Sequence, residues 1–282
     1  MFLLASIRQG SLLIKNDVYT HGHQAAAVEQ HARRTADSCA SFVRAHIRRD
    51  SDILDIGCGP ASITVGLANW ADQGSVTGIE PEKQILIRAA ETVNKAKVRN
   101  VNLEEASVYE LPYKDNSFDL AYAHQVLQHL TDPVLALKEM KRVVKPGGFV
   151  AVRDADYYTM CSNPESLMID KWRHIYRQVA RHNGAEPDAG RYLHGWCIDA
   201  GLSDLMCTAS VWVFAEIEDR LNWGNSWAER CVATSFGHQA VEYGYATSSE
   251  MQEISEGWKT WAELPTGYFH FIHGEVVGIV PR

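Results

Sequence analysis

The sequence of 282 residues predicts an α/β fold, a doubly wound, mostly parallel, seven-stranded sheet with a helical lid inserted before the last strand. Three observations lead to this prediction. Short apolar segments alternate with helical segments from residue 52 to residue 154, which is typical of a parallel sheet. A turn of sequence Gly57-Cys58-Gly59 joins the first strand to the next helix. The last part of the chain changes to longer helical segments rich in tryptophan.

The first half of the chain alternates strands and helices, and turn-forming residues bound each element. Pro60 and Pro81 stand where a helix begins, a position at which the missing N–H of proline costs no hydrogen bond. Lys145-Pro146-Gly147-Gly148 ends the last of these helices. The periodicity predicts helices over residues 23–47, 62–70, 82–97 and 133–144, and strands over residues 52–56, 75–80, 101–107, 118–123 and 149–154.

The second half is predicted to complete the sheet and to cover its mouth with the lid. Its elements are helices over residues 164–183, 190–200, 217–243 and 248–263, and strands over residues 205–214 and 268–280, the last one broken at Gly274. The chain thus divides into an N-terminal helical segment that covers the binding site, a ligand-binding core, and a part that carries the sheet completion and the lid, over residues 1–50, 51–160 and 161–282.

Composition restricts the classes of function. The net charge is −8 and no run of Lys and Arg occurs, which argues against a nucleic-acid surface. Six cysteines are scattered without a C-x-x-C pair, which argues against zinc and predicts a reducing, cytoplasmic compartment. No apolar run approaches the roughly 20 residues of a membrane span. His21, His23 and His31 lack a partner array of Cys or Asp, so no metal site is expected.

Residues 1–16 leave an alternative for localisation. They contain no acidic residue and place Arg8 and Lys15 among apolar side chains, a composition that also occurs in mitochondrial transit segments. Arg8 interrupts the apolar stretch, so a secretory signal is not expected. The expected partners are a small molecule and, as an option left open, a second copy of the chain in a homodimer.

The strand–glycine–helix junction at Gly57 and Gly59 is the strongest local signal for a binding site. Glycine lets the backbone approach a ligand closely, and a helix N-terminus offers unpaired N–H groups. The next strand ends at Glu80, close to the separation of about 20 residues at which an acidic side chain binds ribose hydroxyls. A nicotinamide site requires a third glycine where this chain has Ser62, so a dehydrogenase is disfavoured.

Three ordered segments resemble class I S-adenosylmethionine-dependent methyltransferases, in particular the ubiquinone/menaquinone-biosynthesis-like (type 11) small-molecule branch. Residues 54–61 resemble the family's first motif, Asp-x-Gly-x-Gly-x-Gly, with Ala61 in place of the last glycine, a change expected to cost little at a helix start. Residues 111–119 resemble the entry to the family's fourth strand, and residues 143–148 resemble the turn before its fifth. The resemblance implies S-adenosyl-L-methionine as cofactor and S-adenosyl-L-homocysteine as product.

The resemblance also implies the residues that hold the cofactor. Glu80 would accept hydrogen bonds from the ribose, and Ser107 stands where the family often has an Asp beside the adenine. Arg34, assisted by Tyr19, would bind the carboxylate of the cofactor, because a guanidinium matches a carboxylate bidentately. The complete set of implied contacts is Tyr19, Arg34, Asp55, Gly57, Cys58, Gly59, Glu80, Pro81, Ser107, Val108, Ala123 and His124.

Methyl transfer requires the acceptor atom, the methyl group and the sulfur in line, and a hydroxyl or protonated amine also needs a base. His124 and His129 follow the fourth strand and are the predicted candidates, because imidazole titrates near neutral pH. Asp154 and Asp156 after the fifth strand are further candidates, and one of them is expected to pair with Arg153. The chain lacks the Asn/Asp-Pro-Pro-Tyr/Phe element of enzymes that methylate planar nitrogens, which disfavours DNA adenine and protein glutamine as acceptors.

The aromatic residues of the predicted lid indicate the chemical character of the methyl acceptor. A large aromatic surface over the cofactor suits a hydrophobic molecule, although we expect six of the nine to pack into the core. Two alternatives to methyl transfer remain: a cyclase or rearrangement enzyme that binds S-adenosylmethionine without transferring its methyl group, and a cofactor-binding scaffold. The nine residues are Trp212, Phe214, Trp223, Trp227, Phe236, Trp258, Trp261, Tyr268 and Phe269.

Overall fold

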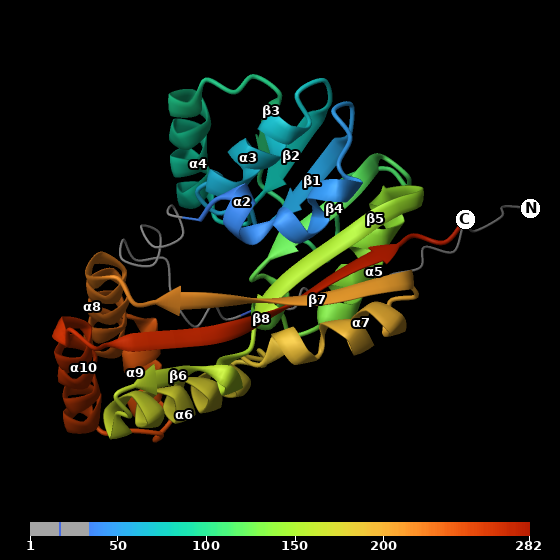
Figure 1. Ribbon diagram of the computed structural model, residues 1–282. Helices are drawn as coiled ribbons and strands as arrows, with labels where there is room; N and C mark the ends of the chain where they lie inside the picture. The colour runs from blue at the N-terminus through green and yellow to red at the C-terminus, as the bar shows by residue number, and fades with distance from the viewer. Residues whose placement is uncertain (1–16, 18–33) are drawn as a thin grey trace, which may run out of the picture.

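The computed structural model describes Asp17 and residues 34–282, and in this part of the chain the fold is built on one eight-stranded sheet. The strand order is β3-β2-β1-β4-β5-β8-β6, and β7 pairs with β8 (Figure 1). The pairs among β1 to β5 are parallel, whereas β8 runs antiparallel to β5, β6 and β7. The strands are Asp52–Ile56, Ser75–Ile79, Val101–Glu104, Phe118–His124, Val144–Ala155, Cys161–Asn163, Ser203–Phe214 and Tyr268–Ile279, numbered β1 to β8 in this order.

The predicted α/β class is confirmed, with one short strand more than the seven expected. This strand, β6, pairs with residues 268–270 of β8, whereas β5 pairs with residues 273–279 of the same strand. The helices are α2 (Ala36–Cys39), α3 (Ser62–Trp70), α4 (Lys83–Ala96), α5 (Pro133–Val143), α6 (Leu167–His182), α7 (Leu193–Asp199), α8 (Ile217–Ala233), α9 (Ser235–Glu242) and α10 (Ser248–Glu263). Among the described helices, none is long and apolar enough to cross a membrane.

The central strands are buried on both faces, as a doubly wound sheet requires. Leu54 and Ala123 belong to a core shared with α5 and α7, whereas Ile53 and Tyr122 belong to a core shared with α2 and α3. Successive residues of a strand point to opposite faces. Both faces of β1 and β4 are therefore apolar, which explains why these strands are continuous hydrophobic runs in the sequence.

The helix expected over residues 23–47 is interrupted in its described part. Thr35 is extended, with φ −125° and ψ 160°, and its side chain caps α2 by accepting a hydrogen bond from the Ser38 N–H. In return, Oγ of Ser38 accepts a hydrogen bond from the Thr35 N–H, so that the two residues form a capping box. Thr35 is thus the N-cap at which α2 begins, and the prediction of one continuous helix was therefore wrong at this point. Residues 23–33 lie outside the described part.

Strand β8 is continuous, although a break was predicted at Gly274. The reason for glycine at this position is a close approach of backbone: a Cβ on Gly274 would lie 2.0 Å from the carbonyl oxygen of Gly190. Gly190 is equally restricted, because a Cβ there would lie 2.8 Å from the Gly274 nitrogen. Glycine in a strand can mark a neighbouring backbone rather than a break in pairing.

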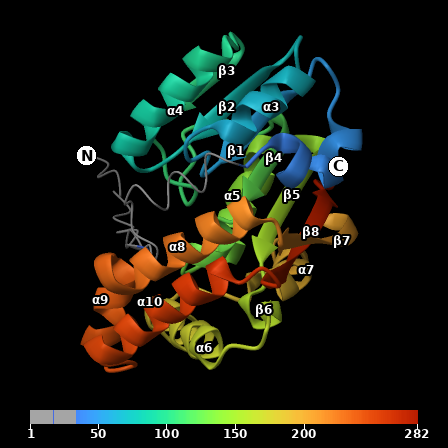
Figure 2. The same ribbon diagram turned by 60° about the vertical axis from the view of Figure 1, so that its left-hand side comes forward.

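Helices α6, α8, α9 and α10 gather at one end of β7 and β8, away from α3 and α4 (Figures 1 and 2). They share a second core dominated by aromatic rings, in which Trp172 contacts Trp227 and Trp258 edge to face at centroid distances of 4.4 and 4.9 Å. Six of the nine aromatic residues that we assigned to the lid are buried there, the number expected. They are Trp223, Trp227, Phe236, Trp258, Trp261 and Phe269, whereas Trp212 and Phe214 are half-buried and Tyr268 is exposed.

Candidate functional site

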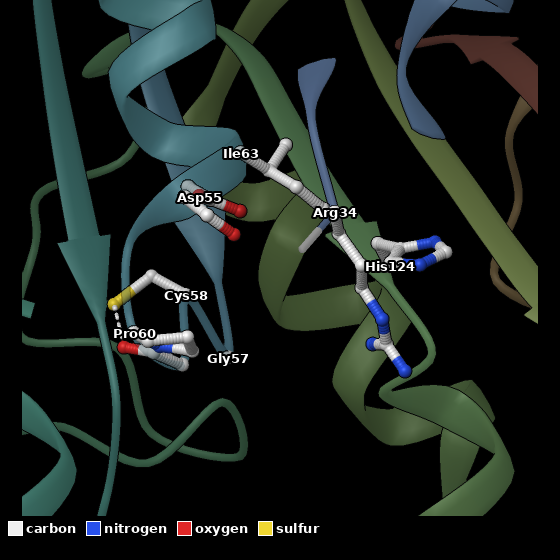
Figure 3. A pocket seen from close by; sticks show the side chains of 9 residues that line it. Arg34, Asp55, Gly57, Cys58, Pro60, Ile63 and His124 are labelled. Atoms are coloured by element: carbon white, nitrogen blue, oxygen red, sulfur yellow. Dashed lines mark hydrogen bonds between the residues drawn. The ribbon is translucent and has the colours of Figure 1, made fainter. Parts of the chain in front are cut away.

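A pocket opens at the carboxyl ends of β1 and β4 (Figure 3). Ligands of open α/β sheets bind at this edge, beyond the carboxyl ends of the parallel strands. The pocket brings together the turn after β1, the start of α3 and the last residue of β4. Its lining consists of Arg34, Asp55, Gly57, Cys58, Gly59, Pro60, Ser62, Ile63 and His124.

The turn after β1 has a backbone that glycine favours. Gly57 and Gly59 have φ angles of +61° and +53°, in the left-handed region. A Cβ on Gly57 would lie 2.7 Å from Cγ2 of Val126, so this position has no room for a side chain. Ala61 also adopts a left-handed conformation, with φ +62°, as the N-cap of α3. Replacement of glycine by Ala61 therefore costs about 1 kcal/mol of backbone strain, and the expectation of a small cost at an ordinary helix start was wrong.

Two carboxyl groups flank this turn. Glu80 Oε2 accepts a hydrogen bond from the Gly59 N–H at 3.2 Å, which brings the end of β2 against the glycine turn. Asp55 accepts a hydrogen bond from the Thr64 hydroxyl at 2.7 Å. Burial raises the pKa of both carboxyls to about 7. Neighbouring positive charge would favour the ionised form of both groups, so the turn is suited to a ligand that carries cationic or hydroxyl groups.

Arg34 reaches the pocket from the chain just before α2. Its Nη2 donates to Oε1 of Gln125 at 2.7 Å, and its guanidinium lies 5.4 Å from the ring centroid of Trp212 on β7. Gln125 follows β4 directly and has a φ angle of +53°. Sequence reasoning missed Gln125, because its role depends on partners from distant segments rather than on a motif.

Behind His124 lies Arg153, which is fully buried on β5. Its Nε lies 3.1 Å from Oε1 of Glu275 on β8, and its Nη1 lies 3.3 Å from Nδ1 of His124. Ser210 on β7 accepts from the same guanidinium at 2.9 Å. We refer to Arg34, His124, Gln125, Arg153, Ser210, His273 and Glu275 as the pocket cluster.

The expected pairing of Arg153 with Asp154 or Asp156 was wrong. Asp154 points to the opposite face of β5, where its Oδ1 accepts from the Gln128 N–H at 3.1 Å. Asp156 lies beyond the strand and accepts from Arg191. Alternation along the strand places residues 153 and 154 on different faces, so the counter-charge of Arg153 comes from the neighbouring strand.

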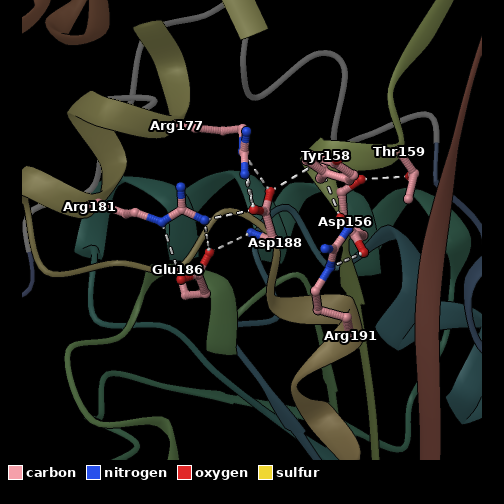
Figure 4. Close-up of polar contacts among 8 residues, drawn as sticks. All are labelled: Asp156, Tyr158, Thr159, Arg177, Arg181, Glu186, Asp188 and Arg191. Atoms are coloured by element: carbon pink, nitrogen blue, oxygen red, sulfur yellow. Dashed lines mark hydrogen bonds and ion pairs between the residues drawn. The ribbon is translucent and has the colours of Figure 1, made fainter. Parts of the chain in front are cut away.

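A second polar cluster joins the end of β5 to α6 and to the short 3-10 helix Ala189–Arg191 (Figure 4). Asp188 pairs with Arg177 and Arg181, each at 2.6 Å. Asp156 accepts two hydrogen bonds from Arg191, at 2.7 and 2.8 Å. Each carboxylate thus has a guanidinium partner. We refer to Asp156, Arg177, Arg181, Glu186, Asp188 and Arg191 as the α6 cluster.

The positions predicted to lie near adenine are less enclosed. β3 ends at Glu104 rather than at residue 107, and Ser107 is exposed in the loop that follows, where its Oγ accepts from the Tyr109 N–H. Val108 is buried and Pro81 is exposed.

Asp17 accepts hydrogen bonds from the Tyr109 hydroxyl at 3.1 Å and from the Thr131 N–H at 2.8 Å. Tyr19 lies outside the described residues.

His129 ends the 3-10 helix Leu127–His129, which follows β4. Burial, together with the charges of Arg34 and Arg230, lowers the pKa of His129 to about 3.

Ala123 is fully buried and Cys58 nearly so, and the N–H of Cys58 donates to the carbonyl of Ile79 at 2.9 Å. Within the described ranges, no group of three or more His, Cys, Asp or Glu side chains is arranged to hold a metal ion.

Comparison with known proteins agrees with this geometry. A family model described as a methyltransferase domain matches residues 54–152. An uncharacterised methyltransferase of Schizosaccharomyces pombe is 35% identical over 270 residues, which cover 92% of this chain and 95% of the relative. The chain belongs to the S-adenosylmethionine-dependent methyltransferase family. The resemblance seen in the three sequence segments is thereby confirmed.

Two further likenesses place this methyltransferase within its family and fold. A demethylmenaquinone methyltransferase of Listeria welshimeri is 31% identical over 137 residues, which cover 48% of this chain and 54% of that protein. The crystal structure of the YcgJ protein of Bacillus subtilis has a TM-score of 0.57 at 17% identity and covers 86% of this chain and 97% of its own. The second likeness concerns the fold alone.

The pocket residues fit the cofactor of the family, S-adenosylmethionine. No atom lies within 4 Å of a Cβ built on Gly59, so the glycine turn leaves open space at this position, and Glu80 presents carboxylate oxygens beside the turn. Arg34 supplies a guanidinium, a partner for a carboxylate. Acidic groups on one side of the pocket and a guanidinium on the other match a ligand that has an amino group, a sulfonium and a carboxylate.

Proposed function

We propose that this enzyme transfers the methyl group of S-adenosylmethionine to a small organic acceptor, of hydrophobic character and similar to a quinone or a secondary metabolite. The observation that carries the proposal is the shared pocket of the left-handed glycine turn, Glu80 at its rim and Arg34 opposite. These groups come from three separate segments, which makes an accidental turn a poor explanation.

The proposed work of the protein is to bind, orient and exclude water. When bound, S-adenosylmethionine supplies an electrophilic methyl group on a positively charged sulfur. Glu80 would accept hydrogen bonds from the ribose hydroxyls, and Arg34 would hold the carboxylate. Fixing the acceptor in line with the methyl group turns a bimolecular step into an effectively unimolecular one. The remaining contacts that we propose are Asp55, Gly57, Cys58, Gly59, Pro81, Ser107, Val108, Ala123 and His124.

Three observations support a small, largely apolar acceptor. The half-buried ring of Trp212 lies beside the pocket, 5.9 Å from the ring of His124. The chain carries a net charge of −8 and no basic run for a nucleic acid. A relative that matches half of the chain is named for a quinone acceptor. We propose that α8 to α10 shape the acceptor side, although most of their aromatic rings serve the second core.

A label-transfer experiment tests this function. The protein is incubated with S-adenosylmethionine labelled in its methyl group and with separate pools of reduced naphthoquinones, phenols, tRNA and DNA. We expect label in a small-molecule product, and label in a nucleic acid would contradict the proposal. An acceptor that is converted without gaining label would point to the cyclase alternative.

Glu80→Ala tests the cofactor site. Loss of two charge-assisted hydrogen bonds is expected to weaken binding of S-adenosylhomocysteine about 100-fold, as measured by titration calorimetry. Glu91→Ala, an exposed position on α4, is the matched control and should leave the affinity unchanged. Native affinity in Glu80→Ala would exclude the proposed ribose contact.

A further inference from the structure

Helix α8 carries two polar groups that are buried and have no hydrogen-bond partner among the described residues. They are Nδ2 of Asn222 and Oγ of Ser226. Only 8% of Ser226 is exposed. Nearly all buried polar groups of folded proteins have a partner, so two unpaired groups on one helix call for a specific explanation. Because the two residues are four positions apart, their side chains lie on the same face of α8.

This face of α8 points away from α10. Gly224 packs against α10 so closely that an added Cβ would lie 2.7 Å from a side chain of that helix. The carbonyl of Ala228 accepts a hydrogen bond from Ser255 of α10 at 2.8 Å. Asn222 and Ser226 each stand two residues before one of these contacts, which places them about 200° around the helix from it. The unpaired groups therefore lie on the side of α8 that α10 leaves uncovered.

The same side of α8 faces the half of the molecule that holds the pocket. In both views α8 lies between α10 and the part that carries α3 and α4 (Figures 1 and 2). Arg230 continues the face one turn beyond Ser226. Burial, Arg34 and Arg230 together lower the pKa of His129, which ends the 3-10 helix after β4. Because the effect of a charge falls with distance, this effect places Arg230 near His129 and the face of α8 near the carboxyl end of β4.

A row of aromatic rings joins the pocket to α8. The ring of His124, which lines the pocket, lies 5.9 Å from the ring of Trp212. The ring of Phe271 follows, 5.7 Å from Trp212 and 5.5 Å from Trp223 of α8. Trp223 is the neighbour of Asn222 in the sequence. The pocket and the two unpaired groups thus belong to one continuous region of the fold.

The indole N–H groups of Trp172 and Trp258 are also without a hydrogen-bond partner in the described part of the chain, but they do not carry this inference. Their rings meet edge to face at a centroid distance of 4.9 Å, a geometry that brings N–H groups onto aromatic faces. A serine hydroxyl and an asparagine amide pair instead with oxygen or nitrogen atoms. Ser226 and Asn222 therefore indicate a missing polar partner more specifically than the indoles do.

We propose that Asn222 and Ser226 form a subsite for the methyl acceptor, in which both donate a hydrogen bond to one carbonyl oxygen that is separate from the atom to be methylated. This inference rests on the proposed function and names a group that its substrate carries. The NH₂ group of an amide only donates, and a carbonyl oxygen has two lone pairs, so one oxygen accepts from both side chains. The apolar part of the acceptor then lies along the row of rings.

Such a subsite discriminates between acceptors. An acceptor with a carbon atom in place of the oxygen would leave both donors buried and unpaired, and a site of this kind rejects that molecule. In the ligand-free protein the two groups make no hydrogen bond, so they add nothing to its stability. Removal of the groups should therefore weaken binding of the carbonyl compound without destabilising the protein.

A ketone and a hydrocarbon of the same shape test the subsite without methyl transfer. 2-Acetylnaphthalene presents a carbonyl oxygen, and 2-isopropenylnaphthalene has a CH₂ group in its place. Equilibrium dialysis measures both dissociation constants with the full chain saturated with S-adenosylhomocysteine. We expect the protein to prefer the ketone by about tenfold, Ser226→Ala or Asn222→Leu to prefer it by about threefold, and the double variant to show no preference.

Ser255→Ala is the matched control, because Ser255 is a buried serine whose hydroxyl has a partner, the carbonyl of Ala228. This variant should keep the preference of about tenfold and lower the Tm of the ligand-free protein by about 2 °C. Ser226→Ala should keep or raise the Tm, because no hydrogen bond is lost. A merely structural role of Ser226 would instead lower the Tm in Ser226→Ala and leave the preference for the ketone unchanged.

The results that would overturn the subsite are equal affinity of the unsubstituted protein for the two probes, binding of neither probe, or an undiminished preference in both single variants. These results are separate from the proposed function, because the dialysis involves no transfer. Absence of methyl transfer to every pool would remove the function, and the preference for the ketone would still be measured. Methyl transfer together with equal probe affinities would leave the function intact and remove only the subsite.

Discussion

The pocket cluster and the α6 cluster are both built from arginine and carboxylate side chains, but their balance of charge differs. In the α6 cluster three guanidiniums meet three carboxylates, and Asp156 and Asp188 are buried with their partners in place. In the pocket cluster the described contacts of Arg153 are one carboxylate, Glu275, the Ser210 hydroxyl and the His124 ring, and Arg34 donates to the neutral amide of Gln125. The α6 cluster therefore joins elements of the fold through matched charges, whereas the pocket cluster combines charged with neutral partners beside the pocket.

Removal of the single carboxylate of the pocket cluster should have the largest effect. Glu275→Gln leaves Arg153 fully buried without a counter-charge, and we expect the free energy of unfolding to fall by about 3 to 5 kcal/mol. Urea denaturation measures this change. The double variant Arg153→Met with Glu275→Leu should recover stability but not methyl transfer. A loss below about 1 kcal/mol for Glu275→Gln would contradict the role of Glu275 as the counter-charge of Arg153.

The α6 cluster should respond less strongly and without a functional effect. In Asp188→Asn, the partners Arg177 and Arg181 have side chains that are 21% and 41% exposed, so water can solvate them, and we expect a loss of about 2 kcal/mol. Calorimetric affinity for S-adenosylhomocysteine should be unchanged. Glu186→Gln is the control at the partly exposed rim of the cluster, with a loss below about 1 kcal/mol. A weakened cofactor affinity in Asp188→Asn would remove the distinction between the two clusters.

The smallest expected effect is the change of the free energy of unfolding with pH. This change has opposite signs for Asp55 beside the pocket and for Asp188 in the α6 cluster. Burial raises the pKa of Asp55 to about 7, above its unfolded value of 3.8, so the free energy of unfolding should fall as pH rises from about 4 to 7. For Asp188, Arg177 and Arg181 outweigh burial and lower the pKa, so its contribution is present above about pH 4 and lost at lower pH.

Asp55→Asn should therefore reduce the fall of the free energy of unfolding with rising pH. At pH 8 we expect the ligand-free variant to be more stable by about 1 kcal/mol, because its weaker hydrogen bond to Thr64 offsets part of the stability gained by removing the buried charge. Urea denaturation across this pH range measures the change, with Asp199→Asn on the exposed end of α7 as control. A steeper fall in Asp55→Asn would show that the carboxyl is ionised and partnered in the folded protein.

Local sequence signals predicted the elements around the pocket closely. β1 and α3 span the predicted residues 52–56 and 62–70, although Pro60 lies in the turn before the N-cap Ala61 rather than in the first helical turn, and the two glycines between them have left-handed backbones. These features depend on neighbouring residues and on backbone sterics. The same applies to Glu80, which lies beside the turn because adjacent parallel strands end at one edge of the sheet.

Local sequence signals did not predict the contacts between segments that are distant in the chain. The pairing of Arg153 with Glu275 joins strands that are antiparallel neighbours only in the folded sheet. The roles of Gln125 and His273 depend on Arg34, a residue 91 positions before Gln125.

The sequence alone determined the α/β class, the family and the glycine turn, because periodicity, backbone preference and short motifs are properties of contiguous residues. The tertiary structure alone decided which aromatic rings form the second core and which carboxylate balances Arg153. Hydrogen bonds and burial depend on side chains that meet in space, and the order of residues along the chain does not specify those meetings.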